Sequence, residues 1–364
     1  MSAPSVTRRP WGRAADGREV EAFTLDNGRG LVLTAIPLGG IVTGLRVPDR
    51  HGNGANVVLA LPTLADYETR NPHLGTIVGR YANRIAGGRF AIDGTQYLLD
   101  ANEGEQSLHG GPVGFGRRWW DIEALPVQDD DSVAIALSLD SADGDQGFPG
   151  RLRVRVRYTL TPAQEWRVDY EATCDRDTVV NLSHHDYFNL AGGGSILDHC
   201  LQIAADHFCP VDGRLIPEGT APVDGTPFDL RTSRRIGERI RDLHPQLLVA
   251  RGYDHCWMLD APSKDGLRLA ARLHDPRSGR VMEVLTDQPA LQFYSGNFLD
   301  GSLPGAHGQS LRQSDGLCLE TQHPPDAPNR PCFPSTLLRP GQTWRSTTVH
   351  RFGIAAPHSS EDYP

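Results

Sequence analysis

A dozen residues, Asn-Leu-Ser-His-His-Asp-Tyr-Phe-Asn-Leu-Ala-Gly at positions 181–192, gather side chains suited to proton transfer. The stretch holds the adjacent pair His184 and His185, followed by Asp186 and Tyr187. Histidine is the one side chain whose unperturbed pKa lets it gain or lose a proton near neutrality. These residues are therefore candidates for acid–base chemistry, although a polar turn after a strand has the same composition.

Four further polar clusters lie between strand-like runs, at residues 79–85, 108–111, 252–257 and 316–329. The first contains Asn83 and Arg84. A guanidinium offers five fixed donors that suit several sugar hydroxyls, although a salt-bridged strand end is the commoner fate of such an arginine. His109 in the second cluster and Asp254 in the third are turn residues or ligand contacts. Glu320 in the fourth cluster follows an apolar run, so we expect its carboxylate to be partly buried. A buried carboxylate needs either an ion-pair partner or a functional role.

The composition of the chain limits the classes of molecule that it is expected to bind. The chain has 364 residues, 38% of them hydrophobic, and a net charge of -9, which argues against a broad basic surface for nucleic acid. No apolar run approaches the roughly 20 residues of a membrane helix, and no signal peptide opens the chain. The six cysteines form no C-x-x-C pair, which favours reduced thiols in a cytoplasmic protein. A small, neutral substrate fits these properties.

Most of the chain alternates between apolar and polar residues, which is the pattern of half-buried β-strands. Apolar residues occupy every second position from Leu152 to Leu160, and the alternation resumes from Trp166 to Cys174. Two antiparallel strands with one wet and one buried face would produce this pattern. Asp93-Gly94, between two shorter alternating runs, favours a tight hairpin turn.

Helical patterns are scarce. Residues 233–244 are compatible with one helix, with Ser233 as N-cap and Pro245 beyond its end. Residues 66–69 are compatible with a single helical turn. No βαβ rhythm, repeat or linker divides the chain. The sequence therefore predicts an all-β fold, a large antiparallel β-sandwich with few short helices, in one domain over residues 19–354 between mobile tails at 1–18 and 355–364.

Taken together, the polar clusters resemble the aldose 1-epimerase (galactose mutarotase) family. The matching segments follow the family's order over nearly the whole chain, at 79–85, 108–111, 114–115, 143–150, 181–192, 211–217, 226–230, 252–255, 292–297, 319–329 and 333–335. One motif alone is modest evidence, whereas their ordered agreement is specific. The resemblance implies a galactose mutarotase-like β-sandwich with a sugar cleft on one face of the sheet, and an isomerase that needs no cofactor.

The resemblance also implies roles for individual residues. His185 matches the family's general acid and Glu320 its general base. The residues that match its sugar contacts are Asn83, Arg84, His109, Tyr187, Asp254 and Gln292. The chain departs from the pattern at His184, where members usually carry asparagine, and at Asp186, where they carry serine or threonine. Alignment through the following Tyr-Phe-Asn-Leu still selects His185 as the acid.

Strand geometry agrees with this choice. If residues 183–187 are extended, His185 and Tyr187 share one face, while His184 and Asp186 point to the other. Adjacent histidines on opposite faces make a poor pair of ligands for one metal. This argues against a zinc site built from His184, His185, His109 and Glu320, and we expect no metal.

The expected activity is the interconversion of α and β anomers of free aldohexoses such as glucose and galactose. Glu320 would take the O1 proton, and His185, protonated in the resting enzyme, would donate a proton to the ring oxygen O5. A glycoside hydrolase using Glu320 with Asp254 is one alternative, and a non-catalytic sugar-binding protein is another. The expected partner is a small aldose, with no nucleic acid and no membrane, and the chain is expected to be a monomer or a homodimer.

Overall fold

The computed structural model of the chain describes residues 2–260 and 266–355. Strands dominate this part of the chain, and its helices are short. The helical segments are α1 (Leu64–Arg70), α2 (Ile236–Arg239) and α3 (Pro245–Ala250), with 3-10 turns η1 (Ala86–Gly88), η2 (Phe115–Arg117), η3 (Asp145–Gly147) and η4 (Ala327–Asn329). The prediction of an all-β fold with few short helices is confirmed.

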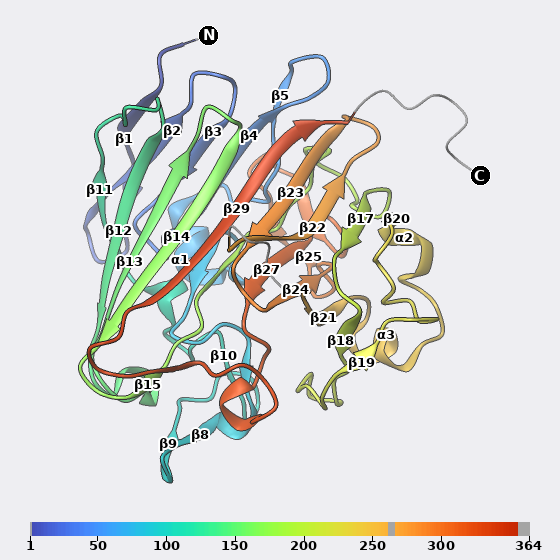
Figure 1. Cartoon of the computed structure of the whole chain (residues 1–364). Coiled ribbons are helices and arrows are strands. Elements are labelled where there is room, and N and C mark those ends of the chain that lie inside the picture. The colour runs from blue at the N-terminus through green and yellow to red at the C-terminus, as the bar shows by residue number, and fades with distance from the viewer. Residues whose placement is uncertain (1, 261–265, 356–364) are drawn as a thin grey trace.

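The largest sheet has nine strands and crosses the molecule as a broad, twisted layer (Figure 1). Its spatial order is β11 (Asp121–Ala124), β12 (Val133–Ser141), β13 (Leu152–Leu160), β14 (Glu165–Cys174), β29 (Trp344–Ile354), β23 (Arg280–Thr286), β22 (Arg268–His274), β17 (Cys200–Ile203) and β20 (Arg234–Arg235). All of its pairings are antiparallel. The predicted strand pair is present as β13 and β14, with Val156 opposite Tyr170.

Two five-stranded sheets supply the rest of the sandwich. The first is β1 (Ser5–Arg13), β2 (Glu19–Asp26), β3 (Val32–Ala35), β4 (Val42–Pro48) and β5 (Gly54–Asn56), in that order. The second has the order β19 (Ala221–Pro222), β18 (His207–Cys209), β21 (Asp254–Met258), β24 (Ala290–Tyr294) and β27 (Cys318–Gln322). The second sheet carries several of the predicted site residues.

Five two-stranded ladders accompany the large sheets in the described residues. They are β6 (Thr76–Val78) with β16 (Ser183–His185), β7 (Arg84–Ile85) with β10 (Ser107–Leu108), β8 (Arg89–Ile92) with β9 (Thr95–Leu98), β15 (Thr178–Val179) with β28 (Leu337–Leu338), and β25 (Asp300–Pro304) with β26 (Ser310–Arg312). The predicted hairpin turn at Asp93-Gly94 joins β8 to β9 and is confirmed.

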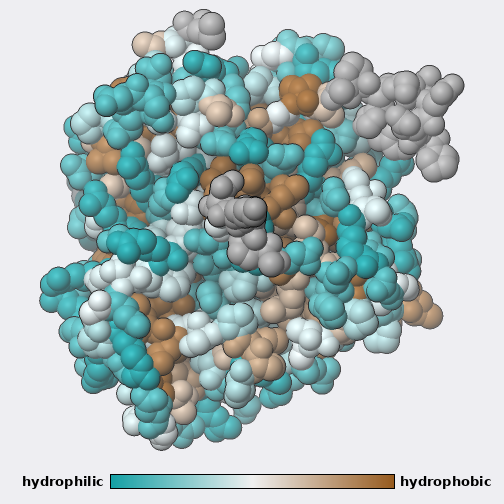
Figure 2. Space-filling model, in the orientation of Figure 1, coloured by the Kyte–Doolittle hydropathy of each residue, from teal (hydrophilic) through white to brown (hydrophobic). Residues whose placement is uncertain are grey.

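One apolar core joins all three large sheets. Its buried members include Leu33 from the first five-stranded sheet, Trp166 and Met282 from the nine-stranded sheet, and Leu291 from the second five-stranded sheet. Face-to-face packing of this kind is what holds a sandwich together. Hydrophilic residues cover most of the visible outer face, and hydrophobic residues form separate small areas on it (Figure 2).

The chain departs from the sequence prediction at its N-terminus. Residues 1–18 were expected to form a mobile tail, but Ser5–Arg13 is strand β1, paired with β2. The register breaks between Pro10 and Gly12, and β1 lies at the edge of its sheet, where proline is tolerated. Of the tail expected at 355–364, residues 356–364 lie outside the described residues.

The predicted helix at 233–244 is also wrong. The segment instead contains strand β20 and the single turn α2, and a new helix, α3, begins at Pro245. Proline favours the first position of a helix because its missing N–H would be unpaired there anyway, so Pro245 starts a helix here. The turn expected at residues 66–69 lies within α1 and is confirmed. Nowhere in the described residues is a helix long and apolar enough to cross a membrane.

Candidate active site

Three strands of the second five-stranded sheet present polar side chains to one face. Glu320 on β27 pairs directly with Gln292 on β24, and Gln292 pairs with Cys256 on β21. Asp254 lies two positions before Cys256 and so shares its face. Gln292 Nε2 donates a hydrogen bond of 2.6 Å to Asp254 Oδ1. All three polar side chains are buried, which is costly without a function or a partner.

His185 comes from a different element, strand β16. This short strand pairs with β6, where His185 lies opposite Thr76, and the Gly75 N–H donates to the His185 carbonyl oxygen at 3.0 Å. Tyr187 stacks on the His185 ring at a centroid distance of 5.2 Å, and its hydroxyl donates to the Pro72 carbonyl oxygen. The prediction that His185 and Tyr187 share a face is therefore confirmed.

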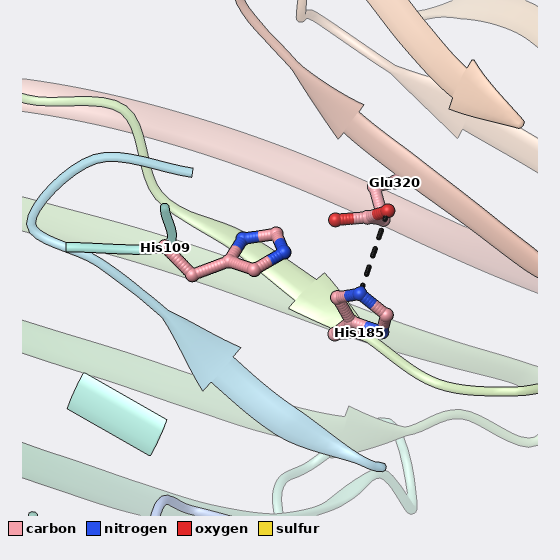
Figure 3. Close-up of side chains that lie close together, drawn as sticks. All are labelled: His109, His185 and Glu320. Carbon is pink, nitrogen blue, oxygen red and sulfur yellow. Dashed lines mark ion pairs between the residues drawn. The ribbon is translucent and has the colours of Figure 1, made fainter. Parts of the chain in front are cut away.

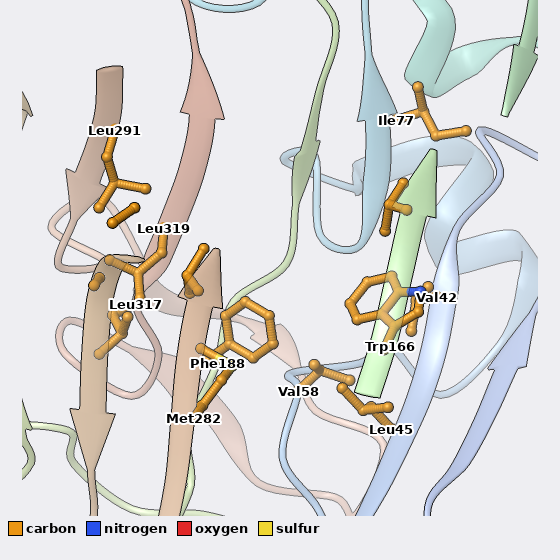
Figure 4. Packing of buried hydrophobic residues seen from close by; sticks show 14 of the residues in the cluster. Val42, Leu45, Val58, Ile77, Trp166, Phe188, Met282, Leu291, Leu317 and Leu319 are labelled. Carbon is orange, nitrogen blue, oxygen red and sulfur yellow. The ribbon is translucent and has the colours of Figure 1, made fainter. Parts of the chain in front are cut away.

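His185 and Glu320 meet in the space between these elements. His185 Nε2 lies 3.8 Å from Glu320 Oε1, and His109 stands beside the pair (Figure 3). Three residues after His185, Phe188 forms isolated backbone bridges with Val58 and Leu317, and these three residues belong to the apolar core (Figure 4). The pair thus stands on close-packed core elements.

The β7–β10 ladder positions the next three predicted residues, because Arg84 lies in β7, Asn83 directly precedes it, and His109 directly follows β10. Arg84 forms a bidentate ion pair with Glu103, with distances of 2.5 Å and 2.7 Å. The Asn83 N–H donates to His109 Nδ1 at 3.1 Å, and the His109 N–H donates back to the Asn83 carbonyl oxygen. Gly110 follows with a φ of +86°, and a Cβ there would overlap a backbone carbonyl, so the turn requires glycine.

The bond at His109 Nδ1 decides what this ring can do. A neutral histidine that accepts a hydrogen bond at Nδ1 carries its proton on Nε2. His109 therefore presents an N–H donor, and burial, followed by the neighbouring His73 and His185, lowers its pKa well below the ordinary value. This is the state that can donate to a sugar hydroxyl.

The same bond bears on metal binding. His109, His185 and Glu320 each offer a ligand atom, and these atoms lie within 4.8 Å of one another. However, a histidine that ligates a metal through Nε2 normally donates its Nδ1–H to an acceptor. His109 Nδ1 instead faces the Asn83 N–H donor. The donor set of this cluster does not fit a metal.

A cavity of about 170 Å³ brings the predicted residues together. Seven of the eight line it, namely Asn83, Arg84, His109, His185, Tyr187, Asp254 and Glu320. Gln292 is not among the lining residues, but it donates a hydrogen bond to Asp254, which is. Two buried oxygens here, Glu320 Oε2 and Gln292 Oε1, have no hydrogen-bond partner in the described residues. A ligand that donates several hydroxyl protons would satisfy such atoms.

Sequence reasoning missed part of the lining, which also includes Pro72, His73, Glu103, Leu108, Tyr294 and Phe298. The His73 ring lies 4.6 Å from the His109 ring and 5.7 Å from the His185 ring, between centroids. Its backbone adopts a φ of +73° in a loop without a recognisable motif. Phe298 is 51% exposed at the edge of the cavity, where an apolar ring can cover one face of a sugar.

Burial dominates the electrostatics of His185 and Glu320. It lowers the pKa of His185 to about 3, with His73 as a smaller cause, and it raises the pKa of Glu320 well above the usual range, with Asp254 adding to it and Arg84 opposing it. Both shifts favour the neutral form of the side chain. The expectation that His185 is protonated in the resting enzyme runs against the direction of its pKa shift.

His184 and Asp186 point away from this cavity. His184 Nε2 shares a hydrogen bond of 2.8 Å with the Tyr158 hydroxyl, and its ring packs edge-on against Trp166. His184 Nδ1 lies 2.6 Å from Asp186 Oδ2, although the two atoms lack the alignment of a hydrogen bond. The two residues that depart from the family pattern thus belong to the interior of the sandwich.

Comparisons with known proteins agree with this geometry. The family model described as Aldose 1-epimerase matches residues 21–351. The chain is 44% identical to galactose mutarotase of Rattus norvegicus, over 96% of this chain and 99% of that protein. It is 40% identical to aldose 1-epimerase of Escherichia coli (strain K12), over 93% and 97% of the two chains.

Solved structures show the same fold. The crystal structure of galactose 1-epimerase from Lactobacillus acidophilus NCFM superposes with a TM-score of 0.85 at 27% identity, covering 97% of this chain and 100% of that one. A homologue from C. elegans gives a TM-score of 0.82 at 28% identity, with the same coverage. The predicted galactose mutarotase-like sandwich is confirmed, and this chain belongs to the aldose 1-epimerase family.

Proposed function

We propose that this isomerase interconverts the α and β anomers of free aldohexoses such as glucose and galactose, with Glu320 as the base on O1 and His185 as the acid on the ring oxygen. The observation that carries the proposal is the buried pair itself, with His185 Nε2 3.8 Å from Glu320 Oε1 inside a polar cavity. Ring opening needs one base and one acid on either side of the C1–O5 region, and the pair supplies both.

The proton count of the pair fits both halves of the reaction. A cyclic sugar loses its O1 proton to the Glu320 carboxylate, while the His185 imidazolium gives its Nε2 proton to O5 and the C1–O5 bond breaks. The pair is then neutral, with a protonated carboxyl and an uncharged ring, which is the state that burial favours. Rotation about C1–C2 and the reverse proton movements close the ring from the other face.

The cyclic sugar must therefore bring the pair to its charged form. Sugar hydroxyls that donate to Glu320 Oε2, which has no partner among the described residues, would stabilise the carboxylate. The Arg84 charge also favours an ionised Glu320. One proton then passes from Glu320 to His185, and no proton from solvent is needed. Sugar binding thereby converts the pair to the charged form that reacts.

The remaining residues hold the sugar. Arg84, fixed by Glu103, keeps its planar guanidinium at the cavity wall, and His109 presents its Nε2–H. Asp254 is oriented by Gln292 and accepts hydroxyl protons. Orientation of this kind lowers the entropic part of the barrier. None of these roles requires a cofactor.

The glycoside-hydrolase alternative is less well supported. It would pair Asp254 with Glu320, and one of the two must be ionised as nucleophile or base. The buried His185, with Nε2 3.8 Å from Glu320 Oε1, would then have no task. A non-catalytic sugar-binding protein would need Arg84 and Asp254 but not the acid–base pair.

Polarimetry on the wild-type protein tests the proposal. Freshly dissolved α-D-glucose and α-D-galactose should relax to anomeric equilibrium at a rate that saturates with substrate and is proportional to enzyme. Release of a chromogenic aglycone from glycosides, or sugar binding without faster relaxation, would contradict it. A cytoplasmic location and a monomeric or homodimeric state remain proposals, and the six free thiols support the former.

A further inference from the structure

The second ring nitrogen of His185 faces a sulfur atom. Cys318 Sγ lies 3.5 Å from His185 Nδ1, while Nε2 at the other side of the ring faces Glu320. Cys318 and Glu320 are two positions apart on β27, so their side chains point to the same face of the sheet. One strand therefore supplies a neighbour to each nitrogen of the ring.

Solvent does not compete for this contact. Cys318 has no exposed surface, and His185 is 5% exposed. Tyr187 lies nearly parallel to the His185 ring, at an interplanar angle of 30°, and limits its rotation. The backbone carbonyl oxygen of His185, which already accepts a hydrogen bond from the Gly75 N–H, is the other acceptor close to Nδ1. The sulfur and this oxygen can both accept a hydrogen bond from Nδ1–H, and the carbonyl cannot donate one.

We propose that Cys318 is a positioning residue for His185, whose sulfur accepts the Nδ1–H and leaves Nε2 as the nitrogen that exchanges a proton with the sugar. The partner of one ring nitrogen sets which nitrogen carries the proton. With Nδ1–H fixed, Nε2 has a proton in the imidazolium and a lone pair in the neutral ring. Ring opening and closure in the proposed function, on which this inference rests, require these two states.

Sulfur suits this position better than a carboxylate. A carboxylate against Nδ1 would stabilise the imidazolium and make it a weaker acid. A neutral thiol is a weak acceptor, so it orients the ring without that effect. Burial, with smaller effects from Glu320, Asp186 and Asp254, raises the pKa of Cys318 well above the ordinary value, and the thiol stays neutral near pH 7.

The tautomer can be measured on the empty full-length protein. Histidine labelled with ¹⁵N gives two-dimensional spectra that separate the Nδ1–H and Nε2–H tautomers, and His185→Asn assigns the relevant signals by their loss. We expect the neutral Nδ1–H tautomer in the wild type and in Cys318→Ser, and a mixture of tautomers in Cys318→Ala. A wild-type spectrum of the Nε2–H tautomer would overturn the inference.

Kinetics supply the second readout. Loss of one hydrogen bond predicts that Cys318→Ala lowers kcat about five- to tenfold with little change in KM, while Cys318→Ser stays within about threefold of wild type. Cys209→Ala is the matched control, because Cys209 is also buried but lies on β18, opposite Cys256. Equal kcat values for Cys318→Ala and this control would also overturn the inference.

The two proposals can fail separately. If the wild type shows no mutarotation, the proposed function is wrong, and the tautomer spectrum still decides the role of Cys318. If Cys318→Ala does not fold, a wild-type spectrum of the Nε2–H tautomer would still overturn the inference.

Discussion

His185 and Glu320 approach each other from strands β16 and β27, with Nε2 3.8 Å from Oε1 and both side chains almost fully buried. Burial favours the neutral form of both side chains, because it lowers the pKa of His185 and raises that of Glu320. In the proposed mechanism the pair shares one proton, and moving that proton from the carboxyl to the ring gives the ion pair that reacts with the sugar. This relationship leads to the predictions below.

His184→Asn separates the two adjacent histidines. His184 is hydrogen-bonded to Tyr158 in the interior, so His184→Asn should keep kcat within a few-fold of the wild-type value. His185→Asn should lose most of the activity. The free energy of unfolding of His184→Asn should fall by about 1–3 kcal/mol, the usual effect of disturbing a buried hydrogen bond. Polarimetry and urea titration measure the two quantities. Equal losses of kcat in the two variants would contradict the assignment of faces.

Glu320→Gln should make the protein more stable at alkaline pH. The folded-state pKa of Glu320 lies above its unfolded value, so ionising the folded carboxyl destabilises the protein as pH rises. Glutamine cannot ionise, so the variant avoids this loss of stability. The difference in the free energy of unfolding between the variant and the wild type should shrink as pH falls toward the ordinary glutamate pKa. Urea titrations of both proteins between pH 5 and pH 9, values chosen to bracket the transition, measure it. A variant that is no more stable than wild type at the alkaline end would contradict the inferred cost.

The sequence allowed much of the sandwich to be predicted, because alternation reports directly which strand face is buried. Strands β13 and β14 follow from that pattern, with their pairing as a simple consequence. Strand β1 did not, since its charged residues and Pro10 resemble a tail when its partner β2 is not considered. The helix that begins at Pro245 was missed because proline suits a helix start as well as the residue after a helix end.

The site was predictable where residues lie in motifs and not where loops supply them. Arg84 and His109 stood out by type and neighbours, but the ion-pair partner Glu103 lies in a loop without a pattern. His73 likewise enters the cavity from a loop whose left-handed backbone no local signal predicts. The face that His185 shares with Tyr187 followed from strand alternation, whereas the lowered pKa of His185 depends on burial and required the packed structure.

Arg84→Lys tests whether planar, bidentate geometry matters at the cavity wall. A lysine cannot reproduce both bonds to Glu103, so the cation should lose its fixed position, and kcat/KM should fall by about tenfold or more. The matched control is Arg118→Lys, because Arg118 is tied to Asp145 and does not line the cavity. Similar small losses in both variants would show that the guanidinium geometry is unimportant.

Chelation tests the metal question. The Asn83 N–H bond to His109 Nδ1 leaves Nε2 protonated, so the cluster with His185 and Glu320 should not hold a metal. Dialysis against a strong chelator should leave kcat unchanged, and elemental analysis of the untreated protein should find far less than one zinc per chain. Activity that is lost on dialysis and restored by added Zn²⁺ would contradict this.

The most direct test of the account compares His185→Asn, Glu320→Gln and the double variant by polarimetry with α-D-galactose. Since the two residues share one proton, each single variant should lower kcat by about 10²–10⁴-fold, and the double variant should lose little more than the worse single one. Circular dichroism and urea titration confirm that each variant is folded. Near-normal rates in either single variant, or losses that simply multiply in the double variant, would contradict the shared-proton mechanism.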